Sequence, residues 1–166
     1  MAGNNVTRML DAKKVAYEAF EIPAEKLSAL EVAEILKVPP ELVFKTIVAN
    51  GDKAGIHILA VVPGSMSVDT KKLAAALNQK KVHIASLHEA EAMTGLKAGG
   101  ISALALMNKG FQTVIDASAR ELEKIIISAG QRGLQVQLAP KDLAGLVHAR
   151  FADITAFLTT TEAVEK

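Results

Sequence analysis

The sequence predicts an α+β fold, with a mixed, mostly antiparallel, curved (barrel-like) sheet and helices packed around it. Helical and strand patterns alternate along the chain without a linker, a low-complexity tract or an internal repeat. The short strands outnumber those that a simple βαβ alternation would give, which favours antiparallel pairing. With 166 residues, of which 50% are hydrophobic, the chain is long enough to fill one core. We therefore expect residues 1–166 to form a single domain.

The first half of the chain predicts two helices, an intervening strand and a β-hairpin. Ser28 is followed three residues later by Glu31, a capping box in which each side chain accepts a backbone N–H at the start of a helix. The expected elements are a helix at 7–16, a strand at 17–22 (YEAFEI), a helix at 28–38 (SALEVAEILKV), and strands at 41–50 (ELVFKTIVAN) and 56–64 (IHILAVVPG) that are joined by the turn NGDKAG.

Capping residues also delimit the later helices. Asp69 is a helix cap, Gly95 ends a helix, and Pro140 can begin the last helix because its missing N–H costs nothing at that position. The expected helices are 68–79, 86–95 and 140–149, with a short one near 119–122, and the expected strands are 81–85 (KVHIA), 103–107 (ALALM), 112–117 (QTVIDA), 123–130 (EKIIISAG) and 134–140 (LQVQLAP).

Charge and targeting patterns argue against several classes of protein. The 19 basic and 18 acidic side chains give a net charge of +1, too near neutral to hold nucleic acid or a membrane surface by bulk charge. The opening residues, MAGNNVTRML, lack the apolar core of a secretory signal, and no run of about 18 apolar residues could span a bilayer. The lack of cysteine fits a reducing compartment. We expect a soluble, cytoplasmic protein without DNA or membrane partners.

Motifs for metal, cofactor and triad chemistry are missing from the sequence. His57, His83, His88 and His148 have no HxxxH spacing, and no cysteine can help to ligate a metal. There is no GxSxG nucleophile elbow, and KAGG at 97–100 matches neither phosphate-binding loop pattern, GxxxxGK[ST] or GxGxxG. We therefore expect no metal and no cofactor.

One lysine stands in an apolar strand. In ELVFKTIVAN, Lys45 shares a strand face with Val43 and Ile47, while Phe44 and Val48 lie on the opposite face. An ammonium group in this position either extends to water or stays near the core and meets an anion. The residues alone leave both alternatives open.

Four ordered segments together resemble the YbaK and prolyl-tRNA-synthetase-associated editing family. They are VFKT, TGLKAGGIS, TVIDA and IIISAGQRGLQVQL, and the likeness runs from about residue 28 to residue 155. Within the family, the chain looks most like the free-standing deacylases of cysteinyl-tRNA(Pro). The resemblance implies hydrolysis of a mischarged aminoacyl-tRNA, contact with the acceptor end, and prolyl-tRNA synthetase as a partner.

The resemblance also implies roles for the lysine and for the glycine-rich loop. Lys45 would anchor the substrate and stabilise charge, as a mobile cation suits a phosphate or ester oxygens. Gly99 and Gly100 would let the backbone approach closely and turn N–H groups towards a carbonyl oxygen that gains charge. Thr46 is either a contact of the terminal nucleotide or an ordinary strand threonine. No general base is assigned, since in the family the substrate's ribose hydroxyl or thiol is thought to assist.

Further residues match the substrate pocket of the family. The implied substrate-binding positions are Ile101, Ser102, Ser128, Gly130 and Gln135. Phe20 is either a residue that closes the pocket or a core phenylalanine.

Two departures from the family pattern bear on substrate choice. Ala103 stands where the family loop usually has proline, and Gln135 stands where the cysteinyl enzymes commonly carry aspartate. An amide cannot supply that negative charge to a substrate ammonium. Two alternatives therefore stay open beside a cysteinyl-tRNA(Pro) deacylase. One is a deacylase for alanine or serine, and the other is a non-catalytic module that binds tRNA ends or nucleotides. The sequence leaves the oligomeric state unassigned.

Overall fold

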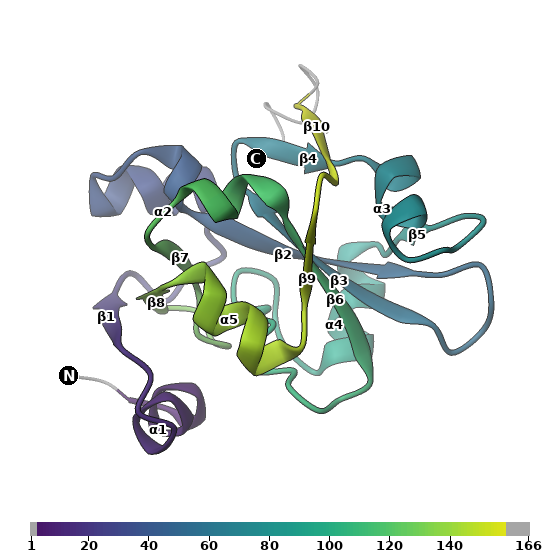
Figure 1. The fold of residues 1–166 in the computed structure, drawn as a ribbon. Coiled ribbons are helices and arrows are strands. Elements are labelled where there is room, and N and C mark those ends of the chain that lie inside the picture. Colours follow the sequence, from purple (N-terminus) through teal and green to yellow (C-terminus); the bar gives the residue numbers. More distant parts are fainter. Residues whose placement is uncertain (1–2, 159–166) are drawn as a thin grey trace.

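A computed structural model gives the fold of residues 3–158, which combines five α-helices with ten strands (Figure 1). The helices are α1 (Asn5–Ala12), α2 (Ala29–Leu36), α3 (Thr70–Ala76), α4 (Leu87–Thr94) and α5 (Pro140–Val147), with 3-10 turns η1 (Pro40–Leu42) and η2 (Ala117–Glu121). The strands are β1 (Tyr17–Glu21), β2 (Phe44–Asn50), β3 (His57–Pro63), β4 (Met66–Val68), β5 (His83–Ile84), β6 (Phe111–Asp116), β7 (Ile125–Ser128), β8 (Leu134–Leu138), β9 (Arg150–Ala152) and β10 (Thr155–Phe157). None of the described helices is long and apolar enough to cross a bilayer.

The strands form three sheets, and most of their pairings are antiparallel, which confirms the α+β class. A five-stranded sheet has the order β5-β2-β3-β6-β9, a three-stranded sheet the order β1-β8-β7, and β10 pairs with β4. Only β3 with β6 and β6 with β9 pair in parallel among the described strands. A single parallel bridge, Val43 with Ile126, joins the start of β2 to β7. These residues therefore form linked sheets rather than one closed barrel.

The predicted hairpin is confirmed, including the alternation of its side chains. β2 and β3 pair antiparallel from Phe44 opposite Pro63 to Asn50 opposite His57. Phe44 and Val48 enter the main core cluster, whereas Ile47 packs against a second cluster on the other side of the sheet. Lys45 therefore projects from the same face as Ile47.

Two faces of the five-stranded sheet are covered by different layers. The main cluster lies between this sheet and the three-stranded sheet, and it also receives side chains from α1, α4 and α5. The second cluster packs α3 against the opposite face. A third, smaller cluster packs α2 onto Val43 and Ile126, where the two sheets meet. Figure 1 shows β2, β3 and β6 crossing the middle of the molecule, with α1 and α3 at opposite ends of the view.

The capping predictions are confirmed by hydrogen bonds. The Ser28 hydroxyl accepts the Glu31 N–H, and the Glu31 carboxylate accepts the Ser28 N–H. Asp69 caps α3, Gly95 ends α4 with φ of 72°, and Pro140 opens α5. Each of these signals depends only on residues within one or two turns, so the sequence is sufficient to predict it.

The first helix begins earlier than residues 7–16 predicted. It runs from Asn5 to Ala12, because the Asn4 side chain accepts the Thr7 N–H and the Thr7 hydroxyl accepts the Asn4 N–H. Thr7 is thus the third helical residue, and Lys14 has left the helix with φ of 57°.

The predicted strand at 103–107 is wrong. Residues 103–108 form turns, with the Leu104 N–H donated to the Ser102 hydroxyl and the Leu106 N–H to the Ala103 carbonyl. The alternating Leu104 and Leu106 are both buried in the main core, so their spacing reflects burial without extended backbone.

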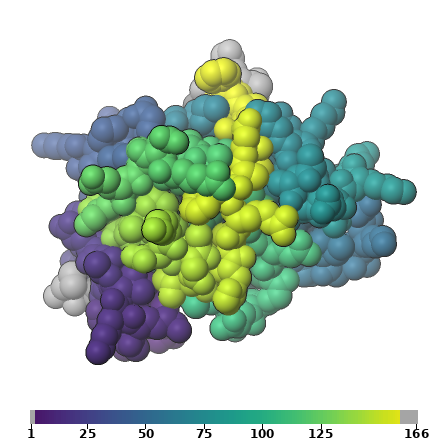
Figure 2. Space-filling model, in the orientation of Figure 1, coloured from purple at the N-terminus to yellow at the C-terminus, as the bar shows by residue number. Residues whose placement is uncertain are grey.

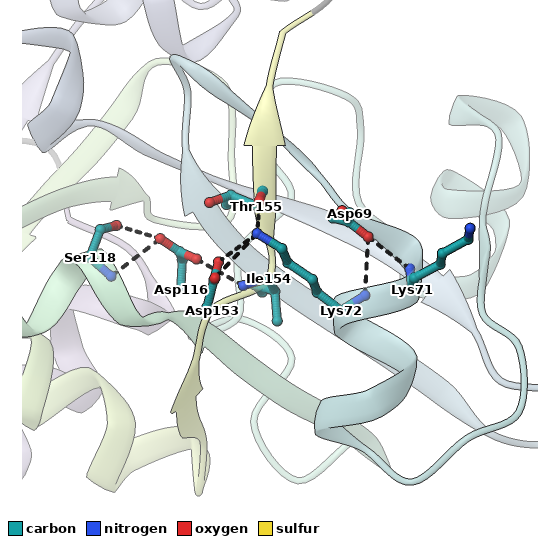
Figure 3. Close-up of polar contacts among 8 residues, drawn as sticks. All are labelled: Asp69, Lys71, Lys72, Asp116, Ser118, Asp153, Ile154 and Thr155. Carbon is teal, nitrogen blue, oxygen red and sulfur yellow. Dashed lines mark hydrogen bonds and ion pairs between the residues drawn. The ribbon is translucent and has the colours of Figure 1, made fainter.

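Three short strands near turns and the C-terminus were absent from the prediction: β4, β9 and β10. The carbonyl of Ile154 accepts the Asp69 N–H at 2.8 Å. Lys72 donates from α3 to the Thr155 carbonyl at 2.9 Å and to the Asp153 carboxylate at 3.2 Å (Figure 3). Figure 2 shows this C-terminal segment, yellow, crossing the visible face between green and teal parts of the chain.

Asp116 fixes the same segment from the end of β6. Its carboxylate is 4% exposed and accepts the backbone N–H of Ser118 at 3.2 Å and of Ile154 at 3.1 Å (Figure 3). We expect Asp116→Ala to lower the free energy of unfolding by about 1 to 3 kcal/mol, because it leaves the buried Ile154 N–H without an acceptor. Urea unfolding measures this loss.

Asp153→Ala is the matched control for that variant. It removes a carboxylate of the same segment whose ion pair with Lys72 is exposed, with side chains 43% and 69% accessible. Such a pair is worth about 0 to 1 kcal/mol, so equal losses in the two variants would contradict the role given to Asp116.

Candidate functional site

A cavity of about 450 Å³ is lined in part by Val43, whose bridge to Ile126 joins the two larger sheets. Its walls come from the segment before and within α2, the start of β2, the turn after β3, the first residue of α4 and the loop after that helix, the end of β7 and the start of β8. The lining residues are Lys26, Leu27, Ser28, Ala29, Glu31, Val32, Val43, Phe44, Lys45, Thr46, Ile47, Gly64, Leu87, Ala98, Gly99, Ile101, Ser128 and Gln135.

The cavity brings together six of the ten residues that the family resemblance assigned to the site. These six are Lys45, Thr46, Gly99, Ile101, Ser128 and Gln135. The other four, Phe20, Gly100, Ser102 and Gly130, are not in its wall.

Lys45, the second residue of β2, is half-buried, and its side chain reaches towards the turn after β3. Its Nζ lies 3.5 Å from the carbonyl oxygen of Gly64, which is also in the cavity wall. The wall holds two other charged side chains, Lys26 and Glu31, and the Glu31 carboxylate is used by the cap of α2. The lysine thus keeps its ammonium group at the cavity, beside a backbone dipole, rather than extending from the far side of the sheet.

The two glycines of KAGG have different structural roles. Gly99 lines the cavity with φ of +89°, and a Cβ there would lie 3.2 Å from the Lys26 Cα. Gly100 donates its N–H to the Lys97 carbonyl at 2.8 Å, so in this structure that group closes a turn. A Cβ on Gly100 would meet the backbone of Gln131 and Arg132 at 2.9 Å. Gly100 thus allows two loops to pack closely, and its role as a donor to the substrate stays a prediction.

Three facing residues form a row across the three-stranded sheet. Gln135 on β8 pairs with Ser128 on β7 and with Phe20 on β1, so their side chains share one face. Gln135 is 4% exposed and lines the cavity with Ser128. Phe20 packs instead against the cluster under α2, which agrees with the core alternative considered for it.

Ser102 and Gly130 support the wall from behind. Ser102 is fully buried, and its hydroxyl accepts the Leu104 N–H at 3.1 Å. Gly130 has φ of +93°, and a Cβ there would lie 2.7 Å from the Ala105 Cβ. Ser102 therefore closes a turn within the loop that follows the glycines, and Gly130 lets that loop approach the end of β7.

Sequence reasoning missed Gly64 and Leu87. A Cβ at Gly64 would lie 2.3 Å from the Ala29 Cβ, so this glycine lets α2 approach the turn after β3 and close one side of the cavity. The Pro-Gly pair at 63–64 signals a turn, but only the fold shows what lies opposite. Leu87 is 54% exposed in the wall, a large apolar side chain open to solvent. Nothing in the local pattern of α4 separates it from an ordinary surface leucine.

Within residues 3–158, no group of three or more His, Asp or Glu side chains is arranged to hold a metal ion. The polar groups in the cavity wall are the ammonium groups of Lys26 and Lys45, the Glu31 carboxylate, the Gln135 amide, backbone groups, and the hydroxyls of Ser28, Thr46 and Ser128.

The chain belongs to the aminoacyl-tRNA editing domain family, whose model matches residues 24–146. It is 41% identical over 153 residues to EbsC of Enterococcus faecalis, a protein described as a candidate Cys-tRNA(Pro)/Cys-tRNA(Cys) deacylase; the match covers 91% of this chain and 92% of EbsC. It is also 29% identical over 118 residues to a proline–tRNA ligase of Kosmotoga olearia, a match that covers 71% of this chain and 20% of the ligase.

Solved structures confirm the fold. One crystal structure of a hypothetical protein superposes with a TM-score of 0.83 at 20% identity, covering 92% of this chain and 100% of the other. Another, of a candidate trans-editing enzyme for prolyl-tRNA synthetase, has a TM-score of 0.76 at 21% identity, covering 94% of this chain and 99% of that one. The arrangement of linked sheets is thus shared with these two solved structures.

Proposed function

We propose that the protein is a trans-editing deacylase that removes cysteine from mischarged tRNA(Pro). The observation that carries the proposal is the cavity in which Lys45 and the backbone of Gly99 face one space, in a chain of the aminoacyl-tRNA editing family. The 41% identity with EbsC over almost the whole chain supports cysteine as the amino acid and tRNA(Pro) as a carrier.

The residues in the wall fit hydrolysis of an aminoacyl ester. Water attacks the ester carbonyl carbon, charge builds on the carbonyl oxygen, and the bond to the ribose oxygen breaks to give free amino acid and tRNA. The Gly99 N–H stabilises that oxygen, and Lys45 adds positive charge beside it. The Glu31 carboxylate in the wall is used by the cap of α2. The family resemblance implies that the substrate's own ribose hydroxyl or thiol assists the proton transfer.

The partners follow from the substrate. With a net charge of +1, the protein lacks the bulk charge to grip a whole tRNA, so contact is concentrated at the acceptor end. Prolyl-tRNA synthetase would supply the choice of tRNA, which agrees with the occurrence of a similar segment within a proline–tRNA ligase. This activity would place the protein in the cytoplasm, where charged tRNA is used.

A panel of charged tRNAs tests this proposal. The protein is incubated with cysteinyl-, alanyl-, seryl- and prolyl-tRNA(Pro), and both release of amino acid and formation of complexes are measured. Preferential release of cysteine supports the proposal. Preferential release of alanine or serine identifies a different editing specificity, and complexes without release identify a binding module.

Gln135→Asp tests how the wall holds the amino acid. A carboxylate in place of the 4% exposed amide would give the substrate ammonium a charge-assisted partner, worth about 1.5 to 3 kcal/mol. We expect KM to fall for both cysteinyl- and alanyl-tRNA, because one methylene of misfit separates small substrates by only about 1 to 3 kcal/mol. Prolyl-tRNA should still be refused, because the substitution does not change which larger side chains the cavity excludes. Measured kcat/KM values for the three substrates decide it, and an unchanged set would contradict this picture of the wall.

A further inference from the structure

The loop after α4 holds its backbone groups through hydrogen bonds from three directions. The Ala98 N–H donates to the Glu91 carboxylate of α4 at 2.8 Å, and the Ala98 carbonyl accepts the Arg132 Nε–H at 2.7 Å. The Gly100 N–H donates to the Lys97 carbonyl. Among the described residues, no hydrogen bond uses the N–H of Gly99. The loop is thus held by hydrogen bonds on both sides of the Gly99 N–H, and Gly99 lines the cavity.

We propose that Arg132, in the turn between β7 and β8, is a positioning residue that aims the Gly99 N–H at the substrate carbonyl. This inference rests on the proposed deacylase function. Arg132 itself is not in the cavity wall and reaches the chemistry only through the peptide that it holds.

The peptide group between Ala98 and Gly99 relates the hydrogen bond of Arg132 to the direction of the Gly99 N–H. The Ala98 carbonyl and the Gly99 N–H belong to the same planar trans peptide, so they point in opposite directions. When Arg132 holds the carbonyl on its own side, the N–H is turned away from Arg132. Because Gly99 lines the cavity, this orientation presents the donor to the space in which Lys45 also ends.

The hydrogen bond to Ala98 also strengthens the donor. A guanidinium that bonds a carbonyl polarises the peptide, and hydrogen bonds in a chain reinforce one another. The backbone of Gln131 and Arg132 packs against Gly100 so closely that a Cβ there would lie 2.9 Å away. The turn that carries Arg132 therefore contacts the loop through both its side chain and its main chain, while Glu91 holds the preceding peptide from α4.

The test compares Arg132→Ala, Arg132→Lys and Arg150→Ala. Arg150 is the matched control, since it also donates to a backbone carbonyl, that of Ala76 at 3.0 Å, but lies outside the cavity wall. For Arg132→Ala we expect the saturating single-turnover rate to fall about 10- to 100-fold, somewhat less than removal of a whole oxyanion donor. We expect unchanged affinity for uncharged tRNA, partial recovery in Arg132→Lys, and no change in Arg150→Ala.

A measurement on the free protein tests the positioning role of Arg132 independently of the proposed deacylase function. The backbone order parameter of Gly99 is measured by NMR in the free proteins, and we expect it to fall from about 0.85 towards 0.6 in Arg132→Ala. If the wild-type protein releases no amino acid from any charged tRNA, the proposed function fails, and this order parameter alone decides the positioning role. An unchanged rate, a change in tRNA affinity alone, or an unchanged order parameter would overturn it.

Glu91→Ala provides a second variant should Arg132→Ala not fold. It removes the other side of the clamp at the Ala98 N–H, whereas Glu91→Gln keeps an acceptor oxygen. We expect a lower rate and order parameter in the first and near-normal values in the second. Equal rates and equal order parameters in the two variants would contradict the role of Glu91 in holding the loop.

Discussion

Lys45→Met is expected to lower the single-turnover rate of deacylation by about 100- to 1,000-fold, the range found when a preorganised charge-stabilising group is removed. Methionine keeps an unbranched apolar stem between β2 and its neighbours but has no ammonium group near the Gly64 carbonyl. The fold should be retained, because loss of a half-buried charge near the start of a strand changes the free energy of unfolding by less than about 1 kcal/mol. Single-turnover hydrolysis and thermal unfolding are measured on the same preparation.

Lys71→Met is the matched control for Lys45→Met. Lys71 is an exposed lysine of α3, outside the cavity wall, so its loss changes the net charge equally. The control should hydrolyse substrate at the wild-type rate. Full activity in Lys45→Met, or equal losses of activity in the two variants, would contradict a catalytic role for Lys45.

Gly100→Ala is expected to lower both stability and turnover. The new Cβ would lie 2.9 Å from backbone atoms of Gln131 and Arg132, which cannot move aside as a flexible side chain can. Overpacking of this kind typically costs about 1 to 3 kcal/mol. The two loops must separate, which lengthens the hydrogen bond from Arg132 to the Ala98 carbonyl and releases the clamp on the Gly99 N–H. Urea unfolding and single-turnover rates measure the two effects.

Gly145→Ala distinguishes crowding from the mere addition of a methyl group. Gly145 is an exposed residue of α5, and a Cβ there meets nothing within 4 Å. Alanine in a helix is favoured over glycine by about 0.8 to 1 kcal/mol, so this variant should gain stability and keep its rate. If Gly100→Ala behaved in the same way, the close approach of the two loops would be wrong.

The parts of the fold that sequence predicts are those with local causes. The Ser28–Glu31 box and the cap at Asp69 depend on neighbours within a turn, and each is present in the structure. Residues 103–107 were predicted as a strand because Leu104 and Leu106 alternate, but turns with hydrogen bonds over three residues also bury both side chains. β10 illustrates another limit, since its three residues pair with Met66–Val68 far away in the chain.

The sequence predicted part of the candidate site and could not predict the rest. Lys45, Gly99, Ser128 and Gln135 were located through the order of family segments, and the cavity brings them together. The use of the Gly100 N–H could not be predicted, because a glycine pair does not specify which of its two N–H groups closes the turn.

Gly64 and Arg132 each contact a segment that is distant in the sequence. The approach of Ala29 to the first and the bond of the second to Ala98 join segments that are 35 and 34 residues apart. No local pattern in the sequence marks such pairs.

Cysteine release from Cys-tRNA(Pro), compared with proline release from Pro-tRNA(Pro), is the most direct measurement of the central claim. Both are followed under single-turnover conditions at the same excess of wild-type protein, with the Lys45→Met protein as the control for spontaneous hydrolysis. We expect rapid release of cysteine by the wild-type protein only, with prolyl-tRNA as stable as it is without protein. Release of proline at the rate of cysteine, or cysteine release no faster than in the Lys45→Met control, would contradict it.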